Sequence, residues 1–212
     1  MKELNLNGIS YLRPLEGTSE WYYALDYARG DLYEEQEIYE EGKTLSGNHF
    51  FLVHFPDGEV FRPFLPTENI AFSDPVYDDQ KISFLAVDFE AGKIRIQQFS
   101  CTDHTVKELD VLPLSSIQNC YNLRLTVRPL TLTRQPNDGT LELIWPEKRT
   151  ISIHERESYY YRDGNDLYFS IWYEDPDYRE ETVIRDAVTG EIRKTLPGDM
   201  QIMPNGEIWY LK

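Results

Sequence analysis

The chain is poor in the residues that build covalent cross-links and metal sites. Among 212 residues, only Cys101 and Cys120 are cysteines, and there are 4 histidines. Two cysteines make neither a disulfide framework nor, by themselves, a zinc site, so we expect two free thiols. His49 and His54 are five apart on one strand-like segment, which points their side chains to opposite faces and prevents joint chelation. We therefore expect no metal and no cofactor.

Long apolar runs and a signal-peptide pattern are also missing. No stretch approaches the roughly 18 apolar residues of a membrane-spanning helix. The first residues, MKELNLNGIS, lack a basic region followed by an apolar one. The sequence therefore predicts a cytoplasmic protein.

Positive charge is scarce, because 21 basic residues stand against 37 acidic ones and the formal net charge is −16. Phosphate binding needs a basic footprint, which makes nucleic acid an unlikely ligand. An anionic membrane surface is disfavoured for the same reason. A basic protein partner or a cation remains open, although net negative charge also serves solubility alone.

Catalytic motifs are absent: the chain has no G-x-S-x-G elbow, no H-E-x-x-H pattern and no glycine-rich phosphate loop. Paired carboxylates could support glycoside hydrolysis if two of them lay about 5–10 Å apart. The candidates lie near turns, where aspartate side chains commonly bond the backbone; they are Asp74, Asp78, Asp79, Asp163 and Asp199. A role without catalysis is the expectation.

Aromatic and β-branched residues are abundant, and they recur in five segments spaced about 40 residues apart, with a shorter first step. The segments are HFFLVHF (49–55), KISFLAV (81–87), LRLTV (123–127), LYFSIWY (167–173) and EIWYL (207–211). Turns ending in glycine precede strand-like stretches throughout, which indicates antiparallel hairpins; these glycines are Gly58, Gly92, Gly139, Gly164, Gly190 and Gly206.

This spacing predicts an all-β chain in which residues 1–212 form a single domain, a small β-propeller of five blades. The C-terminal strand 207–211 is expected to pair with an N-terminal segment, so that both chain ends build one blade. A β-sandwich or an open barrel is the alternative, since both also have evenly spaced strands. Helical periodicity is nearly absent. For residues 30–42 we predict a strand, with a short helix as the alternative.

Three stretches carry a resemblance to a known class of repeats: DPVYDDQKISFLAVD (74–88), YYYRDGNDLYFSIWYE (159–174) and MQIMPNGEIWYL (200–211). They resemble the blade motif of TolB-type and WD-repeat propellers, in which an inner strand runs through a turn into an apolar second strand. The resemblance implies a propeller fold and a tendency toward protein binding. The WD dipeptide and the GH signature are absent, so no functional residue is carried over.

Two acidic segments are the candidate partner-binding sites. One holds Glu34, Glu35 and Glu37, and the other holds Glu174, Asp175 and Asp177 next to Tyr178. Each could dock a basic protein or hold a cation, or simply be a solvated edge or loop tip. Consecutive aromatic residues such as Trp172-Tyr173 and Trp209-Tyr210 belong to a core by default and become anchors if exposed.

The sequence therefore predicts a non-enzymatic binding or scaffold protein with an acidic surface and an unidentified protein partner, for which a basic protein is one option. Self-association is open as well. The alternative function is a carbohydrate-binding or glycan-processing propeller.

Overall fold

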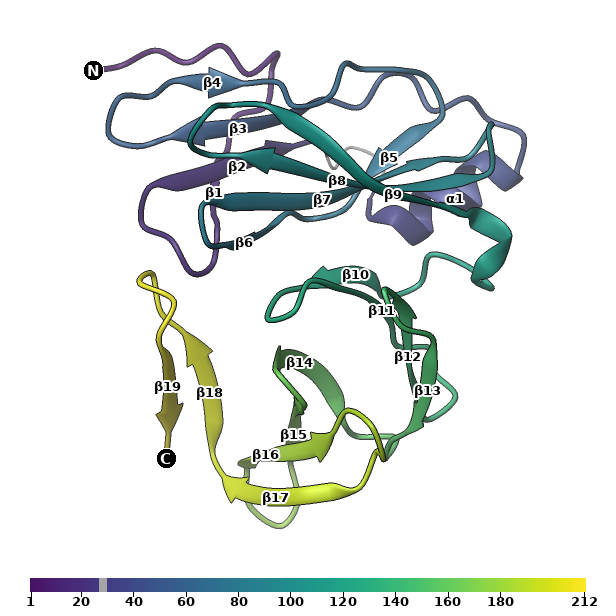
Figure 1. The fold of residues 1–212 in the computed structure, drawn as a ribbon, viewed down its shortest axis with the longest axis vertical. Helices are drawn as coiled ribbons and strands as arrows, with labels where there is room; N and C mark the ends of the chain where they lie inside the picture. The colour runs from purple at the N-terminus through teal and green to yellow at the C-terminus, as the bar shows by residue number, and fades with distance from the viewer. Residues whose placement is uncertain (27–29) are drawn as a thin grey trace. The chain divides into compact units, whose positions relative to one another are not determined.

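The computed structural model describes residues 1–26 and 30–212, and these divide into two compact units, Met1–Tyr121 and Asn122–Lys212 (Figure 1). None of the helices formed by the described residues is long and apolar enough to cross a membrane.

The first unit begins with a four-stranded antiparallel sheet in the order β1-β2-β3-β4. Its strands are β1 (Arg13–Pro14), β2 (Trp21–Leu25), β3 (Phe50–His54) and β4 (Val60–Phe61). The next sheet has five strands, in which β5, β7, β8 and β9 follow one another and β6 also pairs with β7. Its strands are β5 (Ile70–Phe72), β6 (Val76–Asp78), β7 (Lys81–Asp88), β8 (Lys93–Ser100) and β9 (Val106–Pro113), followed by the 3-10 helix η1 (Leu114–Ser116).

These two sheets share one aromatic core. Trp21 on β2 packs edge-on against Phe99 on β8 at 5.5 Å between ring centroids, and Phe50 on β3 packs edge-on against Phe84 on β7 at 4.7 Å. Strand β7 is buried along both of its faces between Ile82 and Val87. Burial on both faces explains why this segment is apolar except for Ser83 and does not alternate between apolar and polar residues.

The second unit contains two four-stranded antiparallel meanders and a hairpin. The first meander consists of β10 (Leu123–Thr126), β11 (Thr131–Arg134), β12 (Thr140–Trp145) and β13 (Arg149–Ser152). The second consists of β14 (Ser158–Asp163), β15 (Asp166–Tyr173), β16 (Arg179–Asp186) and β17 (Ile192–Pro197). The hairpin consists of β18 (Asp199–Ile202) and β19 (Ile208–Leu211). Leu141 and Leu143 on the first meander join Phe169 and Val183 on the second in one buried cluster.

The fold is thus mostly β, built from four successive antiparallel sheets of four or five strands and a C-terminal hairpin, and the four larger sheets are arranged as in the blades of a β-propeller. Separate meanders of this kind exclude a single open barrel. The expected fifth blade and closure are not shown. Strand β19 pairs with β18 alone among the described residues, and β1 at the N-terminal end pairs with β2. That residues 1–212 form a single domain stays a prediction.

The prediction of a strand at residues 30–42 is wrong, and its alternative, a short helix, is confirmed as α1 (Leu32–Glu40). Asp31 caps the helix by accepting from the backbone N–H groups of Tyr33 and Glu34, at 2.9 and 3.0 Å. The side chain of Glu34 accepts from the Asp31 N–H in return, at 2.9 Å. This capping box satisfies the free donors of the first turn and selects helix over strand.

Replacing Phe169 with alanine tests the core of the second unit. Phe169 is fully buried, so Phe169→Ala should lower the free energy of unfolding by about 3–5 kcal/mol. Trp172 on the same strand is 53% exposed, and Trp172→Ala should change the free energy of unfolding by no more than about 0.5 kcal/mol. Urea titrations of both variants measure the contrast. Equal losses would contradict the burial described here.

Candidate binding groove at the C-terminal hairpin

Gly198 joins the C-terminal hairpin to the sheet before it. Its N–H donates to the carbonyl of Glu180 on β16 at 2.7 Å, and the hydroxyl of Thr182 donates to the Gly198 carbonyl at 2.8 Å. The φ angle of Gly198 is +115°, and a Cβ atom there would lie 1.9 Å from the carbonyl oxygen of Leu211. Only glycine permits this approach of two backbones.

Arg128 makes a second connection to the hairpin, from the turn between β10 and β11. Its guanidinium donates to the hydroxyl of Tyr161 and to the carbonyl of Gly206 in the β18–β19 turn, both at 3.2 Å. The N–H of Gly164, in the β14–β15 turn, donates to the Arg128 carbonyl at 2.8 Å. The first hairpin turns of three successive sheets therefore meet at one arginine.

A surface groove of about 480 Å³ lies where β16 begins, where β17 passes into β18 and where β19 ends. Tyr178, Gly198 and Leu211 are among its lining residues, together with the charged side chains of Glu180 and Asp199. The groove exists because Gly198 and its neighbours bring the hairpin against the sheet. It lies entirely within the second unit.

Tyr178 is the exposed aromatic residue of this groove, and its side chain is held in place. Its hydroxyl donates to Glu180 Oε1 at 2.5 Å. The pKa of Tyr178 is raised first by this hydrogen bond, then by desolvation and by the carboxylates of Glu180 and Asp199. The neutral phenol therefore persists at and above neutral pH, and it offers an amphipathic contact surface.

The acidic loop predicted from the sequence borders the groove. Glu174, Asp175 and Asp177 are exposed in the connection between β15 and β16, and Tyr178 ends that connection with 67% of its surface exposed. Arg179, the next residue, stacks its guanidinium 3.9 Å from the centroid of the Tyr173 ring. That contact fixes the C-terminal side of the loop.

The acidic helix of the first unit is a poorer candidate than its composition indicated. Glu34 is engaged in the capping box, and Glu37 is exposed. Glu35 is buried at 3% exposure, and both of its carboxylate oxygens accept from the side-chain amide of Asn48, at 2.8 and 2.9 Å. The proposal of Glu35 as a partner-binding residue is therefore corrected: its carboxylate is a structural acceptor in the interior.

Sequence reasoning missed Gly198, Arg128 and Leu211 as residues that shape the site. The dipeptide Pro197-Gly198 is a turn signal that could have drawn attention to the first. For Arg128 the local signal is the proline that follows it. The approach of Leu211 to Gly198 has no local signal, because it joins positions in different strands.

The described residues offer no support for metal or thiol chemistry. No group of three or more metal-ligating side chains occurs among them. Cys101 and Cys120 are free thiols, as predicted. Burial, together with the nearby carboxylate of Glu20, raises the pKa of Cys101 to about 12. A thiol with that pKa is protonated at neutral pH and is a poor nucleophile.

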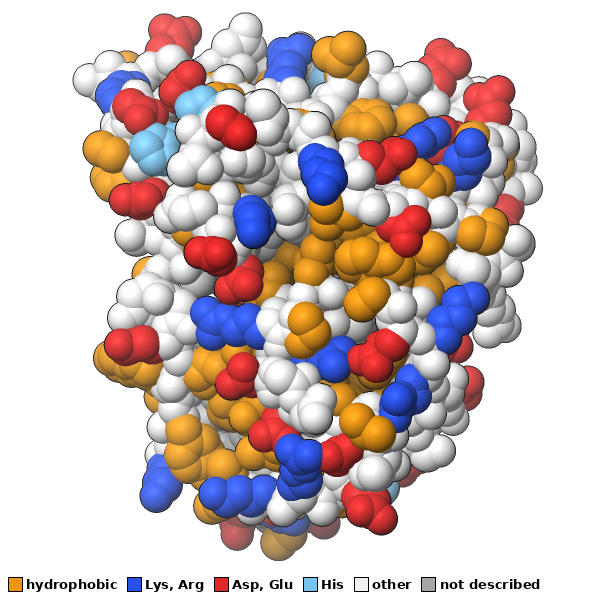
Figure 2. Space-filling view, viewed as in Figure 1, with side chains coloured by type: hydrophobic (Ala, Val, Ile, Leu, Met, Phe, Trp, Pro, Cys, Tyr) orange, Lys and Arg blue, Asp and Glu red, His pale blue; other side chains and the backbone are white. Residues whose placement is uncertain are grey.

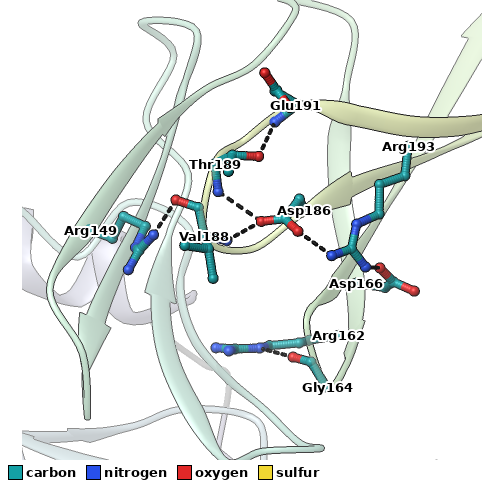
Figure 3. A network of polar contacts seen from close by, with 9 residues as sticks. All are labelled: Arg149, Arg162, Gly164, Asp166, Asp186, Val188, Thr189, Glu191 and Arg193. Carbon is teal, nitrogen blue, oxygen red and sulfur yellow. Dashed lines mark hydrogen bonds and ion pairs between the residues drawn. The ribbon is translucent and has the colours of Figure 1, made fainter.

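A polar network stabilises the sheet that carries the groove (Figure 3). Asp166 on β15 lies directly opposite Asp186 on β16, and the guanidinium of Arg193 binds both carboxylates. Asp186 also accepts from the N–H groups of Thr189 and Val188, at 2.8 and 2.7 Å. These backbone hydrogen bonds, with Arg193, lower the pKa of Asp186. The network keeps two like charges compatible within one ladder.

Comparisons with known proteins do not assign the chain to a family. No protein-family description and no curated protein matches it. Among solved structures, the acylaminoacyl peptidase of Pyrococcus horikoshii (orthorhombic crystal form) is a match with 12% sequence identity and a TM-score of 0.46. The match covers 90% of this chain and 33% of that one, so this chain spans about a third of its length. Strand pairing, and not this likeness, defines the fold.

Acid titration tests the Asp186 network. Because the folded-state pKa of Asp186 is lowered, its contribution to stability is full above the unfolded pKa of about 3.9 and is lost as the pH falls through the folded value. Asp186→Asn should therefore be less stable than the wild type at pH 6, and the difference should shrink below about pH 4. Urea unfolding midpoints of both proteins, determined from pH 6 to below pH 4, measure this difference in stability.

Thr189→Ala is the matched control for that titration, because it keeps the backbone N–H that Asp186 accepts from and changes no ionisable group. The difference in stability between Thr189→Ala and the wild type should not vary with pH. A difference for Asp186→Asn that is equally independent of pH would contradict the role given to the carboxylate.

Proposed function

We propose that this chain is a non-enzymatic binding protein whose C-terminal groove docks an extended, basic segment of a partner protein. The observation that carries the proposal is the exposed Tyr178, held by Glu180 within the groove and flanked by the acidic loop. Exposed aromatic residues with a polar tip are typical anchors of protein interfaces.

The sign of the partner's charge follows from the local residues. The acidic residues of the loop are Glu174, Asp175 and Asp177. The groove itself is lined by two acidic residues, Glu180 and Asp199, and by two basic residues, Arg179 and Lys212. On the face shown in Figure 2, acidic and basic side chains are interspersed with exposed apolar ones. A basic segment would therefore be attracted by this local acidic cluster, which also increases its rate of association.

The propeller assignment can be taken one step further within this proposal. We infer that hairpin β18–β19 is the first half of a fifth blade. Support comes from Arg128, which contacts the turn of this hairpin as well as residues of the neighbouring sheet. The groove then lies at the junction between one complete blade and an incomplete one.

The binding test uses a labelled peptide rich in Lys and Arg, with Tyr between the charges, and a matched peptide in which Glu replaces the basic residues. The basic peptide should bind, and more weakly at high salt. Glu174→Gln with Asp177→Asn should weaken binding about three- to tenfold, because each exposed ion pair contributes up to about 1 kcal/mol.

A variant of the helix in the first unit controls for net charge. Glu37→Gln with Glu40→Gln removes the same charge from exposed positions of α1, in the other compact unit, and should leave the affinity unchanged. An equal loss in both variants would show a non-specific charge effect and contradict the proposal. Absence of binding by the basic peptide would contradict it as well.

A carbohydrate ligand is the second candidate, because Trp172 and Trp209 are 53% and 51% exposed and could stack on sugar rings. Titration of neutral oligosaccharides, followed by tryptophan fluorescence, tests it. A saturable change that is lost in Trp172→Ala would favour a sugar over a basic peptide.

A further inference from the structure

The first sheet of the first unit, β1-β2-β3-β4, has two apolar faces. Successive side chains on a strand point to opposite faces. Trp21 and Leu25 on β2, with Phe50 on β3, belong to the aromatic core shared with the second sheet. The opposite face is covered by Leu6, from the segment that precedes β1. Residues 1–10 are termed the strap, and the side chains beneath them are termed the strap face; these are Tyr22, Ala24, Phe51, Val53 and Val60.

The strap is held by side chains and not by strand pairing. Leu6 is buried, and Leu4 and Ile9 are partly buried against the same cluster. The N–H of Ile9 donates to the carbonyl of Leu6, and the N–H of Asn7 donates to Asn5 Oδ1, both at 3.1 Å. Within the described part of the chain, the backbone of the strap makes no hydrogen bond to the sheet. The strap can therefore open without breaking a strand ladder, as local unfolding of a loosely held segment requires.

A lysine fixes one end of the strap. The ammonium of Lys2 donates to the carbonyl oxygens of Pro56 and Asp57, in the turn between β3 and β4. Gly58 in this turn leaves room for the strap, because an added Cβ would lie 3.3 Å from both Lys2 Cδ and Leu4 Cδ2. Hydrogen bonds from an ammonium are stronger than those from a neutral donor. The turn is therefore a seat for a cationic side chain.

The strap satisfies the polar groups beside its other end only in part. Asn7 and Gly8 have φ angles of +52° and +91°, which reverse the chain direction as in a type I′ turn. The side-chain amide of Asn7 donates to Nε2 of His49, whose ring stacks on Phe51 of the strap face with 6.1 Å between centroids. Nδ1 of the His49 ring is buried and has no hydrogen-bond partner among the described residues. A buried polar atom without a partner costs free energy, so the closed strap is an imperfect occupant.

We propose that the strap face is a docking site for an extended segment of a partner protein, and that the strap is the intramolecular competitor for this site. The strap itself shows the chemistry that fits, a lysine followed by apolar residues two and four positions later: Lys2, Leu4 and Leu6. All three contact the first sheet or its β3–β4 turn, as alternate residues of an extended segment do. A lysine in the partner also complements the net charge of −16. The proposal does not rest on the groove of the second unit.

A labelled peptide with the sequence of residues 1–12 is the probe, and fluorescence anisotropy measures its binding. The wild type should bind this peptide weakly, because its own strap occupies the site. Leu6→Asp removes the buried anchor of the strap and leaves the strap face unchanged. This variant should bind the peptide at least about tenfold more tightly, since the apparent affinity rises with the fraction of open sites. Leu65→Asp adds the same charge at a side chain that is 73% exposed and lies outside the strap, and it should bind like the wild type.

One substitution should act in opposite directions in the chain and in the peptide. Lys2→Glu in the chain weakens the competitor and should tighten peptide binding roughly threefold. Lys2→Glu in the peptide weakens the ligand and should reduce its affinity for the Lys2→Glu chain by a similar factor. Competition for one seat predicts this reciprocity. Lys2 is exposed, so this arm decides the question even if Leu6→Asp does not fold.

Circular dichroism and thermal unfolding establish which variants are folded. Equal peptide binding by the wild type and the strap variants overturns the proposal, and so does the absence of binding by all of them at about 1 mM peptide. Self-association of a strap variant in sedimentation equilibrium would assign the strap face to a second copy and would also overturn it. Glu174→Gln with Asp177→Asn, in the second unit, should leave the affinity for this peptide unchanged. A loss of affinity there would place the peptide in the groove and contradict docking on the strap face.

Discussion

The groove at the C-terminal hairpin depends on the close approach of two backbones at Gly198. This residue bonds β16 through Glu180 and Thr182, and it leaves no room for a side chain beneath the carbonyl of Leu211. The hairpin β18–β19 is positioned by that approach, with Arg128 bonding its turn. A short hairpin has little stability of its own in water, so these contacts decide whether it is ordered.

Two features with different consequences arise from this single arrangement. On one side, the hairpin and the start of β16 enclose the groove in which Tyr178 is held beside the acidic loop. On the other side, the hairpin presents β19 as an uncharged edge with two exposed apolar side chains. The first is the groove in which we propose that a basic partner segment docks. Both would be lost together if the hairpin detached.

Local patterns predicted the strands well, because turns such as Asn205-Gly206 and alternating burial are encoded over a few residues. Local patterns also allowed the acidic loop at 174–177 and the exposure of Tyr178 to be predicted. The number of complete sheets could not be predicted in this way, since it depends on which distant strands pair. Among the residues that the structure describes, β19 pairs with β18 alone. The helix at 32–40 could have been recognised from the Asp31–Glu34 capping box. The burial of Glu35 depends on Asn48, thirteen residues away, which no local pattern reveals.

Hydrogen exchange of the wild type and Gly198→Ala, followed residue by residue, tests most directly whether the hairpin is held as described. Gly164→Ala is the control, because Gly164 also has a positive φ, +56°, but nothing within 4 Å of an added Cβ. In the wild type, the Gly198 amide and the β18–β19 ladder should be protected like β16. Gly198→Ala should abolish the protection of β18 and β19 while β14–β17 stays protected, and the control should keep both. Protection of β18–β19 that is unchanged in Gly198→Ala would contradict the account.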